Sequence, residues 1–94
     1  MRVGIVGAGL IGSRRAAVVA QTDGCRVEAV ADTDIARAGR LAEIHGARAS
    51  CDWQSLVMNP AVDAVVIATP NKFAMPVAVA AAANGKHILC EKPL

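Results

Sequence analysis

Residues 4–12 read GIVGAGLIG, and this stretch decides the fold. Its first part belongs to an apolar run over residues 1–6, which is typical of a strand buried on both faces. Its second part holds Gly7, Gly9 and Gly12 in the spacing G-x-G-x-x-G, and a helical pattern follows directly. The stretch therefore predicts a strand, a tight turn and a helix in immediate succession.

Each glycine has its own role in such a turn. Gly7 allows the tight turn out of the strand, Gly9 lets a phosphate approach the backbone, and Gly12 lets the helix pack close to the sheet. The start of the helix, which includes Leu10 and Ile11, directs unpaired N–H groups and a partial positive charge toward phosphates. A lone G-x-G-x-x-G is weak evidence, because glycines also serve packing alone.

Asp32 supplies the second half of a dinucleotide-binding pattern. It lies twenty positions after Gly12, at the end of a second apolar strand over residues 26–31. A carboxylate there accepts hydrogen bonds from the adenosine ribose and repels a 2′-phosphate, which predicts a preference for NAD over NADP. Thr33 is assigned to the same site but has no guanidinium to bind a 2′-phosphate. Arg37 is expected to lie too far along the next helix to bind it. Alternatively, Asp32 only caps that helix.

The remaining sequence alternates helical and strand patterns. We expect helices over 11–21, 34–45, 52–58 and 75–84, and strands over 1–6, 26–31, 47–51, 63–68 and 87–90. Pro76 is expected in the first turn of the last helix. This alternation predicts right-handed βαβ units, and hence an α/β Rossmann fold with a doubly wound parallel sheet of five strands in the order 3-2-1-4-5.

Composition excludes several classes of function. Apolar residues make up 54% of the chain and charged residues 19%, which excludes a disordered chain. The length of 94 residues is enough for one domain. The net charge of +2 and only two aromatic residues, Trp53 and Phe73, provide neither a basic surface nor stacking platforms for nucleic acid. Trp53 is predicted to be a packing residue.

Cysteine usage and hydropathy predict the compartment. Cys25, Cys51 and Cys90 are widely spaced and form no C-x-x-C pair, as expected for reduced thiols in the cytoplasm. No apolar run approaches the ~20 residues that span a membrane. We therefore expect a soluble cytoplasmic chain, and we assign no metal site.

The fourth strand and the chain's last residues carry a resemblance to a known family. Residues 62–71 read VDAVVIATPN, and residues 85–94 read GKHILCEKPL. Together they resemble the N-terminal NAD(P)-binding domain of the Gfo/Idh/MocA (glucose–fructose oxidoreductase/inositol dehydrogenase) family. The glycine loop and Asp32 fit the same family, so the resemblance covers the whole chain.

The resemblance implies roles for the residues that follow the last two strands. Thr69, Pro70 and Asn71 would lie along the nicotinamide half of the cofactor. Lys92 would be the catalytic residue, near the nicotinamide and the substrate hydroxyl, where it orients the substrate or relays its proton. Glu91 would contact the nicotinamide ribose or its surroundings. The alternative for Lys92 is an exposed lysine after a strand.

The resemblance also implies an activity and a missing partner domain. Family members transfer a hydride between nicotinamide and a hydroxyl-bearing carbon of a sugar, polyol or inositol. A second domain, absent from residues 1–94, would supply the substrate pocket and most contacts of a homo-oligomer. We therefore expect the isolated chain to be marginally stable and inactive, with weak dinucleotide affinity.

Two other functions remain open at this point. One is a non-catalytic NAD(P)-binding regulator with the same family resemblance, and the other is a different two-domain reductase, of the dihydrodipicolinate or homoserine type. The chain also departs from many family members at Ala74, where they carry a histidine. That departure leaves the substrate subclass undefined.

Overall fold

Strands and helices alternate through residues 1–90, the part that this computed structural model describes; residues 91–94 and the side chain of Asn71 lie outside the description. The elements are β1 (Arg2–Val6), α1 (Leu10–Gln21), β2 (Arg26–Ala31), α2 (Ile35–His45), β3 (Arg48–Ser50), α3 (Trp53–Met58), β4 (Ala64–Ile67), α4 (Asn71–Ala83) and β5 (His87–Cys90). The sequence predicted every one of them, and only the start of α4 differs by more than one residue.

The strands form one parallel sheet in the order β3-β2-β1-β4-β5, which confirms the predicted order. The topological switch point therefore lies between β1 and β4, where ligands bind in open α/β folds. Val6 is level with Ala31 on one side and with Ile67 on the other. Ser50 and Cys90 end the outer strands at the same level. The loops after the strands consequently open at one common edge.

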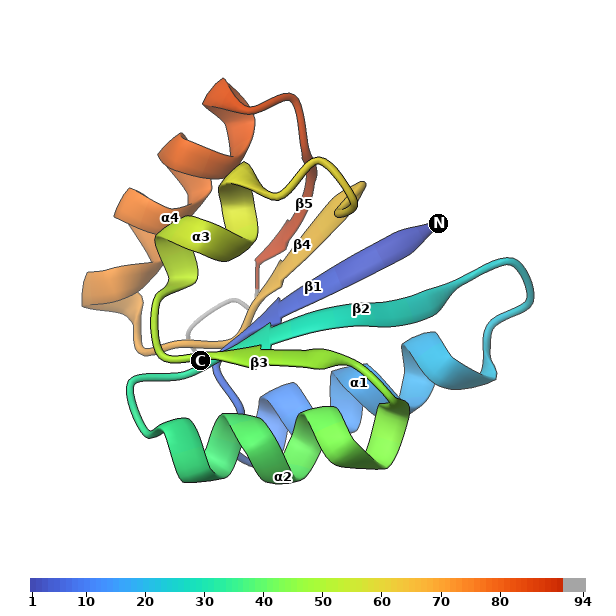
Figure 1. The fold of residues 1–94 in the computed structure, drawn as a ribbon. Helices are drawn as coiled ribbons and strands as arrows, with labels where there is room; N and C mark the ends of the chain where they lie inside the picture. The colour runs from blue at the N-terminus through green and yellow to red at the C-terminus, as the bar shows by residue number, and fades with distance from the viewer. Residues whose placement is uncertain (91–94) are drawn as a thin grey trace.

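Helices cover both faces of the sheet, α1 and α2 on one face and α3 and α4 on the other (Figure 1). Each face has its own apolar core. Ile5 and Leu41 belong to the core under α1 and α2, whereas Val65, Leu56 and Val77 belong to the core under α3 and α4. Alternate residues of β1 and β4 therefore point into different cores, as their continuous apolar runs require.

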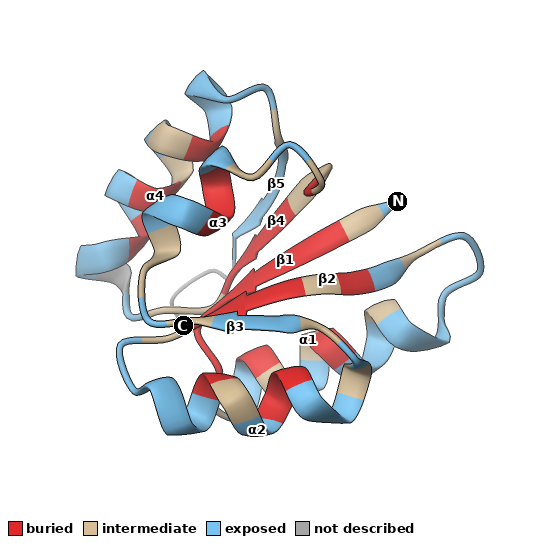
Figure 2. Ribbon diagram, in the orientation of Figure 1, coloured by how far each residue is buried: buried red, intermediate tan, exposed pale blue. Residues whose placement is uncertain are grey.

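Burial falls from the middle of the sheet to its edges. Figure 2 shows the buried residues concentrated in β1, β2 and β4, whereas β3 and β5 are largely exposed. All four residues of β5 are exposed, because the sheet order places this strand at an edge within the described chain.

The helices begin in two different ways at the carboxyl edge of the sheet. Asp34 caps α2 and Asp52 caps α3, each through side-chain hydrogen bonds accepted from backbone N–H groups of the first turn. Gly9 precedes α1 and Pro70 precedes α4, and neither provides a side-chain cap. The first turns of α1 and α4, which flank the switch point, thus keep backbone donors for another partner.

The prediction for the start of α4 was wrong. The helix begins at Asn71 rather than near Met75, so Pro76 lies inside it rather than in its first turn. Pro70, with φ of −55°, already sets the backbone for helix entry. Pro76 removes only the hydrogen bond to the carbonyl of Lys72, a residue exposed to water at the helix start, so the helix continues through it.

A charged pair joins β1 and β4 at the opposite, amino edge of the sheet. Arg2 donates to Asp63 from its backbone N at 2.7 Å and from Nε and Nη2 at 3.2 and 3.1 Å. These hydrogen bonds from Arg2 lower the pKa of the Asp63 carboxyl to about 2. The pair is far along the strands from the switch-point loops and belongs to the framework of the fold.

Candidate cofactor-binding site

The loops after β1, β2 and β4 converge at the carboxyl edge. Gly7 N donates to Ala31 O, and Ala68 N donates to Val6 O, both at 2.8 Å, so the ladder of hydrogen bonds continues just past the strand ends. Beyond these bonds the chain opens into a cavity of about 460 Å³. Its position at the switch point is the one where an open α/β sheet binds its ligand.

The cavity has two ends with different linings. Its floor includes Gly7 and Gly9 of the glycine loop. We call the side after β2 the Asp32 end, which is formed by Asp32, Thr33 and Arg37. We call the side after β4 the Thr69 end, which is formed by Ala68, Thr69, Pro70 and Phe73. The cavity therefore joins the three segments that the sequence assigned to one cofactor.

The glycine loop is built by close approach of backbone to backbone. Gly7 has φ of +102°, and a Cβ there would lie 2.7 Å from Ala68 O. A Cβ on Gly12 would lie 1.7 Å from Gly7 O, so no side chain fits between α1 and the turn. A Cβ on Gly9 would find its nearest neighbour, Arg37 Nη1, at 3.8 Å. A Cβ on Gly9 would therefore make only an ordinary van der Waals contact with a flexible side chain, whereas Gly7 and Gly12 are required by packing.

Asp32 ties the glycine loop to the loop after β2. Its Oδ2 accepts a hydrogen bond from Ala8 N at 2.7 Å, and its Oδ1 accepts one from Asp34 N at 2.8 Å. The side chain is only 10% exposed, yet it lines the cavity. A carboxylate has about four acceptor positions, so two remain for a ligand. The alternative that Asp32 caps α2 is wrong, because Asp34 is the cap.

Arg37 corrects a second expectation at this end. Its Nη1 lies 4.0 Å from Asp32 Oδ2, and its side chain lines the cavity. Arg37 is also exposed by 49%. It reaches Asp32 because Asp34 caps α2, which places Arg37 in the first turn of the helix, directly beside the loop. The spacing from Asp34 to Arg37 was a usable signal in the sequence.

Thr69 lies at the opposite end of the cavity with an unused hydroxyl. Its Oγ1 is buried and has no hydrogen-bond partner within residues 1–90. A buried polar atom without a partner is costly, so such atoms in a cavity indicate a missing ligand or water. Pro70 is at the N-cap position of α4, and Asn71 is the first helical residue. Thr69 and Pro70 therefore lie between β4 and α4, and Asn71 begins α4.

The two aromatic residues are placed where the sequence did not expect them. Both Trp53 and Phe73 line the cavity, together with Cys51. Trp53 also packs against the core under α3 and α4, so the prediction that it is a packing residue holds in part. Lys72 lies over the ring of Phe73, with Nζ 5.1 Å from the ring centroid. No pattern in the sequence linked these residues to the glycine loop.

The other predicted positions fall outside the cavity lining. Leu10 and Ile11 are exposed by 66% and 42%, and they form the start of α1, which has no side-chain cap. Ala74, where many family members carry histidine, is 8% exposed and packs in the core under α4. Glu91 and Lys92, which follow Cys90 in the sequence, lie outside the described residues.

No group of three or more His, Cys, Asp or Glu side chains within residues 1–90 is arranged to hold a metal ion. Within the same residues, every helix is too short or too polar to cross a bilayer.

The carboxyl edge thus has the form of a dinucleotide-binding site on a Rossmann fold. A family model described as an oxidoreductase family with an NAD-binding Rossmann fold matches residues 1–94. The chain belongs to this family, Gfo/Idh/MocA, as the resemblance in its sequence implied. By this membership it is an NAD-binding domain of the oxidoreductase type.

Individual relatives support the same assignment. Inositol 2-dehydrogenase 4 of Saccharopolyspora erythraea is 43% identical over 96 aligned residues, which cover all of this chain and 28% of that protein. Myo-inositol dehydrogenase from Lactobacillus casei, in complex with NAD(H) and myo-inositol, superimposes with a TM-score of 0.93 at 28% identity, over 100% of this chain and 29% of that one.

A second structural relative has a different substrate and cofactor. Biliverdin reductase from Synechocystis, in complex with biliverdin and NADP+, superimposes with a TM-score of 0.90 at 36% identity, over 99% of this chain and 29% of that one. The chain therefore spans between a quarter and a third of these relatives. Similar domains occur with both cofactors, so the choice between NAD and NADP depends on individual side chains.

Proposed function

We propose that the chain is the cofactor-binding domain of an NAD-dependent oxidoreductase that acts on a hydroxyl-bearing carbon of inositol, a sugar or a polyol. The observation that carries this proposal is the single cavity that joins the glycine loop, Asp32 and Thr69. The inositol dehydrogenases among its relatives support the class of substrate.

The residues present fit a dinucleotide. Gly9 carries no side chain between the backbone and the cavity that it lines, Thr69 Oγ1 lacks a partner among the described residues, and α1 begins without a side-chain cap. We assign the pyrophosphate to the glycine loop, which consists of Gly7, Gly9 and Gly12, and to the backbone N–H groups of Leu10 and Ile11. The nicotinamide supplies hydride transfer, and the protein binds and orients it.

The adenosine ribose is assigned to Asp32, with Thr33 beside it. The two acceptor positions of Asp32 that remain free match two ribose hydroxyls, and the negative charge disfavours a 2′-phosphate. We therefore propose that NAD is preferred over NADP.

The nicotinamide is assigned to the Thr69 end, with Thr69, Pro70 and Asn71. Lys92 is the proposed catalytic residue, which orients the substrate hydroxyl or moves its proton, and Glu91 is assigned to the nicotinamide ribose. Both follow β5, which ends at the same edge of the sheet. Their position in the sequence, directly after this strand, supports their assignment to the site. Their individual roles rest on the family resemblance.

The remaining proposals concern the whole protein. We propose a second domain with the substrate pocket, a homo-oligomer built mainly by that domain, and a cytoplasmic location. Cys25 and Cys51 form no disulfide in this fold, which is compatible with a reducing compartment.

Calorimetric titration with NAD and NADP on the protein at its natural length tests the cofactor. We expect saturable binding of both with tighter binding of NAD, and a clear preference for NADP would refute the assignment to Asp32.

Turnover is then measured with myo-inositol, sugars and polyols. Lys92→Ala should lower turnover at least a hundredfold with little change in NAD affinity, because general acid–base catalysis contributes 10²–10⁴-fold. Lys86→Ala, outside the cavity lining, is the control, and its stability is measured alongside because Lys86 Nζ donates to Asn59 O and Val62 O.

The non-catalytic regulator is the second candidate. It would use the same cavity and bind NAD equally well. The same experiment separates the two, since a regulator binds NAD but shows no turnover with any of the hydroxylated substrates, and Lys92→Ala then has no effect.

A further inference from the structure

Lys72 is a cation beside the Thr69 end of the cavity that the cofactor assignment does not use. It lies in the first turn of α4, is exposed, and forms no ion pair with a carboxylate of residues 1–90. Its Nζ lies 5.1 Å from the centroid of the Phe73 ring, and Phe73 lines the cavity. An aromatic ring rather than a carboxylate therefore holds this charge at the edge of the site.

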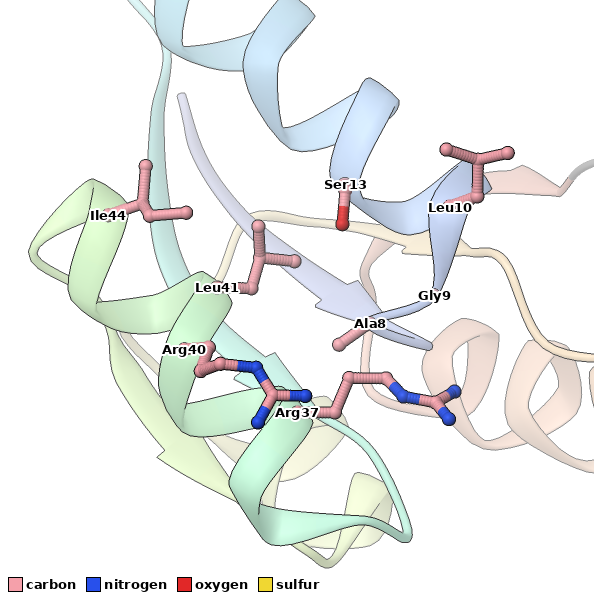
Figure 3. A pocket seen from close by; sticks show the side chains of 8 residues that line it. All are labelled: Ala8, Gly9, Leu10, Ser13, Arg37, Arg40, Leu41 and Ile44. Carbon is pink, nitrogen blue, oxygen red and sulfur yellow. The ribbon is translucent and has the colours of Figure 1, made fainter.

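The Asp32 end, by contrast, contains charges of both signs. Arg37 Nη1 lies 4.0 Å from Asp32 Oδ2, and Asp34 adds a second carboxylate at the start of α2. Figure 3 shows Arg37 and Arg40 extending from α2 beside an outer groove of about 590 Å³, which lies between α1 and α2. Two arginines and two carboxylates thus share this end, so their charges largely compensate.

The Thr69 end has no such compensation within the described chain. The first turn of α4 contains no acidic residue, and the helix begins without a side-chain cap. The helix dipole adds a partial positive charge at this point, which makes it an unfavourable position for a lysine unless an anion is nearby. The cavity lining on this side has no carboxylate and consists of Ala68, Thr69, Pro70, Phe73 and Val77.

The bound cofactor would increase the positive charge here. Oxidised nicotinamide is cationic and is assigned to this end, whereas the pyrophosphate is assigned to α1, the other helix without a side-chain cap. The surface around Lys72 is apolar, since Phe73 and Met75 are exposed by 52% and 69%. Charges interact more strongly beside apolar surface than in bulk water. A negative group beside Lys72 would therefore be stabilised, and the substrate is the molecule that lies against the nicotinamide.

We infer that Lys72 selects a substrate that carries an anionic group, a carboxylate or a phosphate, in addition to the hydroxyl that is oxidised. This inference rests on the proposed function and narrows its substrate class from neutral sugars, polyols and inositols to their acids and phosphate esters. The Lys72 ammonium and the first turn of α4 bind the anionic group, while the hydroxyl-bearing carbon faces the nicotinamide. Lys72 is thus a specificity-determining residue and takes no part in the hydride transfer.

The test uses two pairs of probes that differ in one anionic group, D-glucose with D-glucuronate and myo-inositol with myo-inositol 1-phosphate. Steady-state kinetics are measured on the protein at its natural length. We expect a higher kcat/KM for the charged member of at least one pair, and the pair that shows it identifies the anion as carboxylate or phosphate.

Three variants then assign this preference to Lys72. Lys72→Gln should raise the KM of the charged probe roughly tenfold, with kcat and the KM of the neutral probe changed far less, because a charge-assisted hydrogen bond is lost. Lys72→Arg should restore part of the loss. Arg48→Gln, exposed at the start of β3 and outside the cavity lining, is the matched control and should leave both members of each pair unchanged.

The two redox forms of the cofactor provide a readout that needs no substrate. Lys72→Gln should tighten the binding of NAD+ relative to NADH by roughly two- to threefold, because only the oxidised ring is cationic. A purely structural role of Lys72 would change the affinities for both forms equally. High salt should reduce the preference for the charged probe in the wild type but not in Lys72→Gln.

Two results would overturn the inference. One is a preference for the neutral member of both pairs, and the other is an equal loss for both members of a pair in Lys72→Gln. Binding of NAD+ without turnover of any of the four probes would instead refute the proposed function. In that case an unchanged ratio of NAD+ to NADH affinity in Lys72→Gln would also refute the placement of Lys72 beside the nicotinamide, so the two failures are distinguishable.

Discussion

The two ends of the cavity differ in how the protein has already satisfied its polar groups. At the Asp32 end, the carboxylate accepts two backbone hydrogen bonds at 2.7 and 2.8 Å and joins the glycine loop to α2. At the Thr69 end, the hydroxyl is buried and has no partner within the described chain. Asp32 therefore contributes to both the fold and the proposed ligand site, whereas the Thr69 hydroxyl is expected to contribute to ligand binding alone.

This difference predicts how substitutions should behave. A change at the Asp32 end or in the glycine loop should alter stability and cofactor affinity together, because the same contacts serve both. A change at Thr69 should separate the two quantities. A substitution at the amino edge of the sheet should affect stability alone.

The largest effect is expected for Gly12→Ala, which would disrupt the packing of α1 against the glycine loop, between the two ends of the cavity. Its Cβ would lie 1.7 Å from Gly7 O. Because Gly7 O is a backbone atom, relieving this clash would displace the whole turn. We expect a loss of about 3 kcal/mol in the free energy of unfolding, measured with urea, and no detectable NAD binding. Gly39→Ala on α2 is the matched control, because its Cβ meets nothing within 4 Å. It should stabilise the chain by about 0.5–1 kcal/mol. A stable Gly12→Ala variant that binds NAD would contradict the proposed packing role.

Asp32→Asn is expected to weaken fold and binding together. The amide keeps one acceptor oxygen but presents an NH₂ group to one of the two backbone donors, Ala8 or Asp34. We expect a loss of about 2 kcal/mol in stability by urea unfolding and at least tenfold weaker NAD binding by calorimetry. Unchanged stability with lost binding would mean that Asp32 serves the ligand alone, and the comparison between the two ends would fail.

Thr69→Val should separate stability from binding. The substitution removes the hydroxyl that lacks a partner and keeps the branched shape, so the free energy of unfolding should change by less than about 1 kcal/mol, and upward if at all. NAD affinity should fall roughly five- to tenfold, since one hydrogen bond contributes about 1 kcal/mol. Thermal unfolding with and without NAD measures both quantities. A large loss of stability in the absence of NAD would show that the hydroxyl has a structural role.

The smallest effect is expected at the amino edge, for Asp63→Asn. The hydrogen bonds from Arg2 lower the pKa of Asp63 to about 2 from an ordinary value of 3.8. A carboxylate with a lowered pKa stabilises the fold above the ordinary pKa and loses that contribution as the pH falls toward the folded value. Wild type should therefore be slightly more stable than Asp63→Asn at pH 7, and the two should converge between pH 4 and 2. NAD affinity should be equal in both.

The sequence predicted the fold more completely than the site. Glycine spacing, apolar runs and helix stops are local patterns, and they were sufficient for the element order, the sheet order, the turn at Gly7 and the packing role of Gly12. The start of α4 was missed because proline is compatible with a helix interior when the carbonyl that loses its partner is exposed, and exposure at Lys72 depends on the packed structure.

The site was predicted where it follows strand ends and missed where it depends on contacts across the fold. Asp32 and Thr69 directly follow strands, so a parallel sheet brings them to one edge whatever their neighbours are. Trp53 and Phe73 reach the cavity only because α3 and α4 pack on the same face of the sheet. Arg37 reaches it because the cap at Asp34 sets the start and rotation of α2.

By itself, the sequence determined that this chain forms a Rossmann sheet with a glycine loop and an acidic residue at a shared edge, because both follow from residue spacing along each strand and helix. The tertiary structure alone decided which groups at that edge are already paired. Hydrogen bonds from Ala8 N and Asp34 N occupy two of the acceptor positions of the Asp32 carboxylate, and Arg37 lies beside it. The hydroxyl of Thr69 has no partner in the described chain. Such pairing depends on distances between segments that are remote in sequence, which only the packed sheet and helices define.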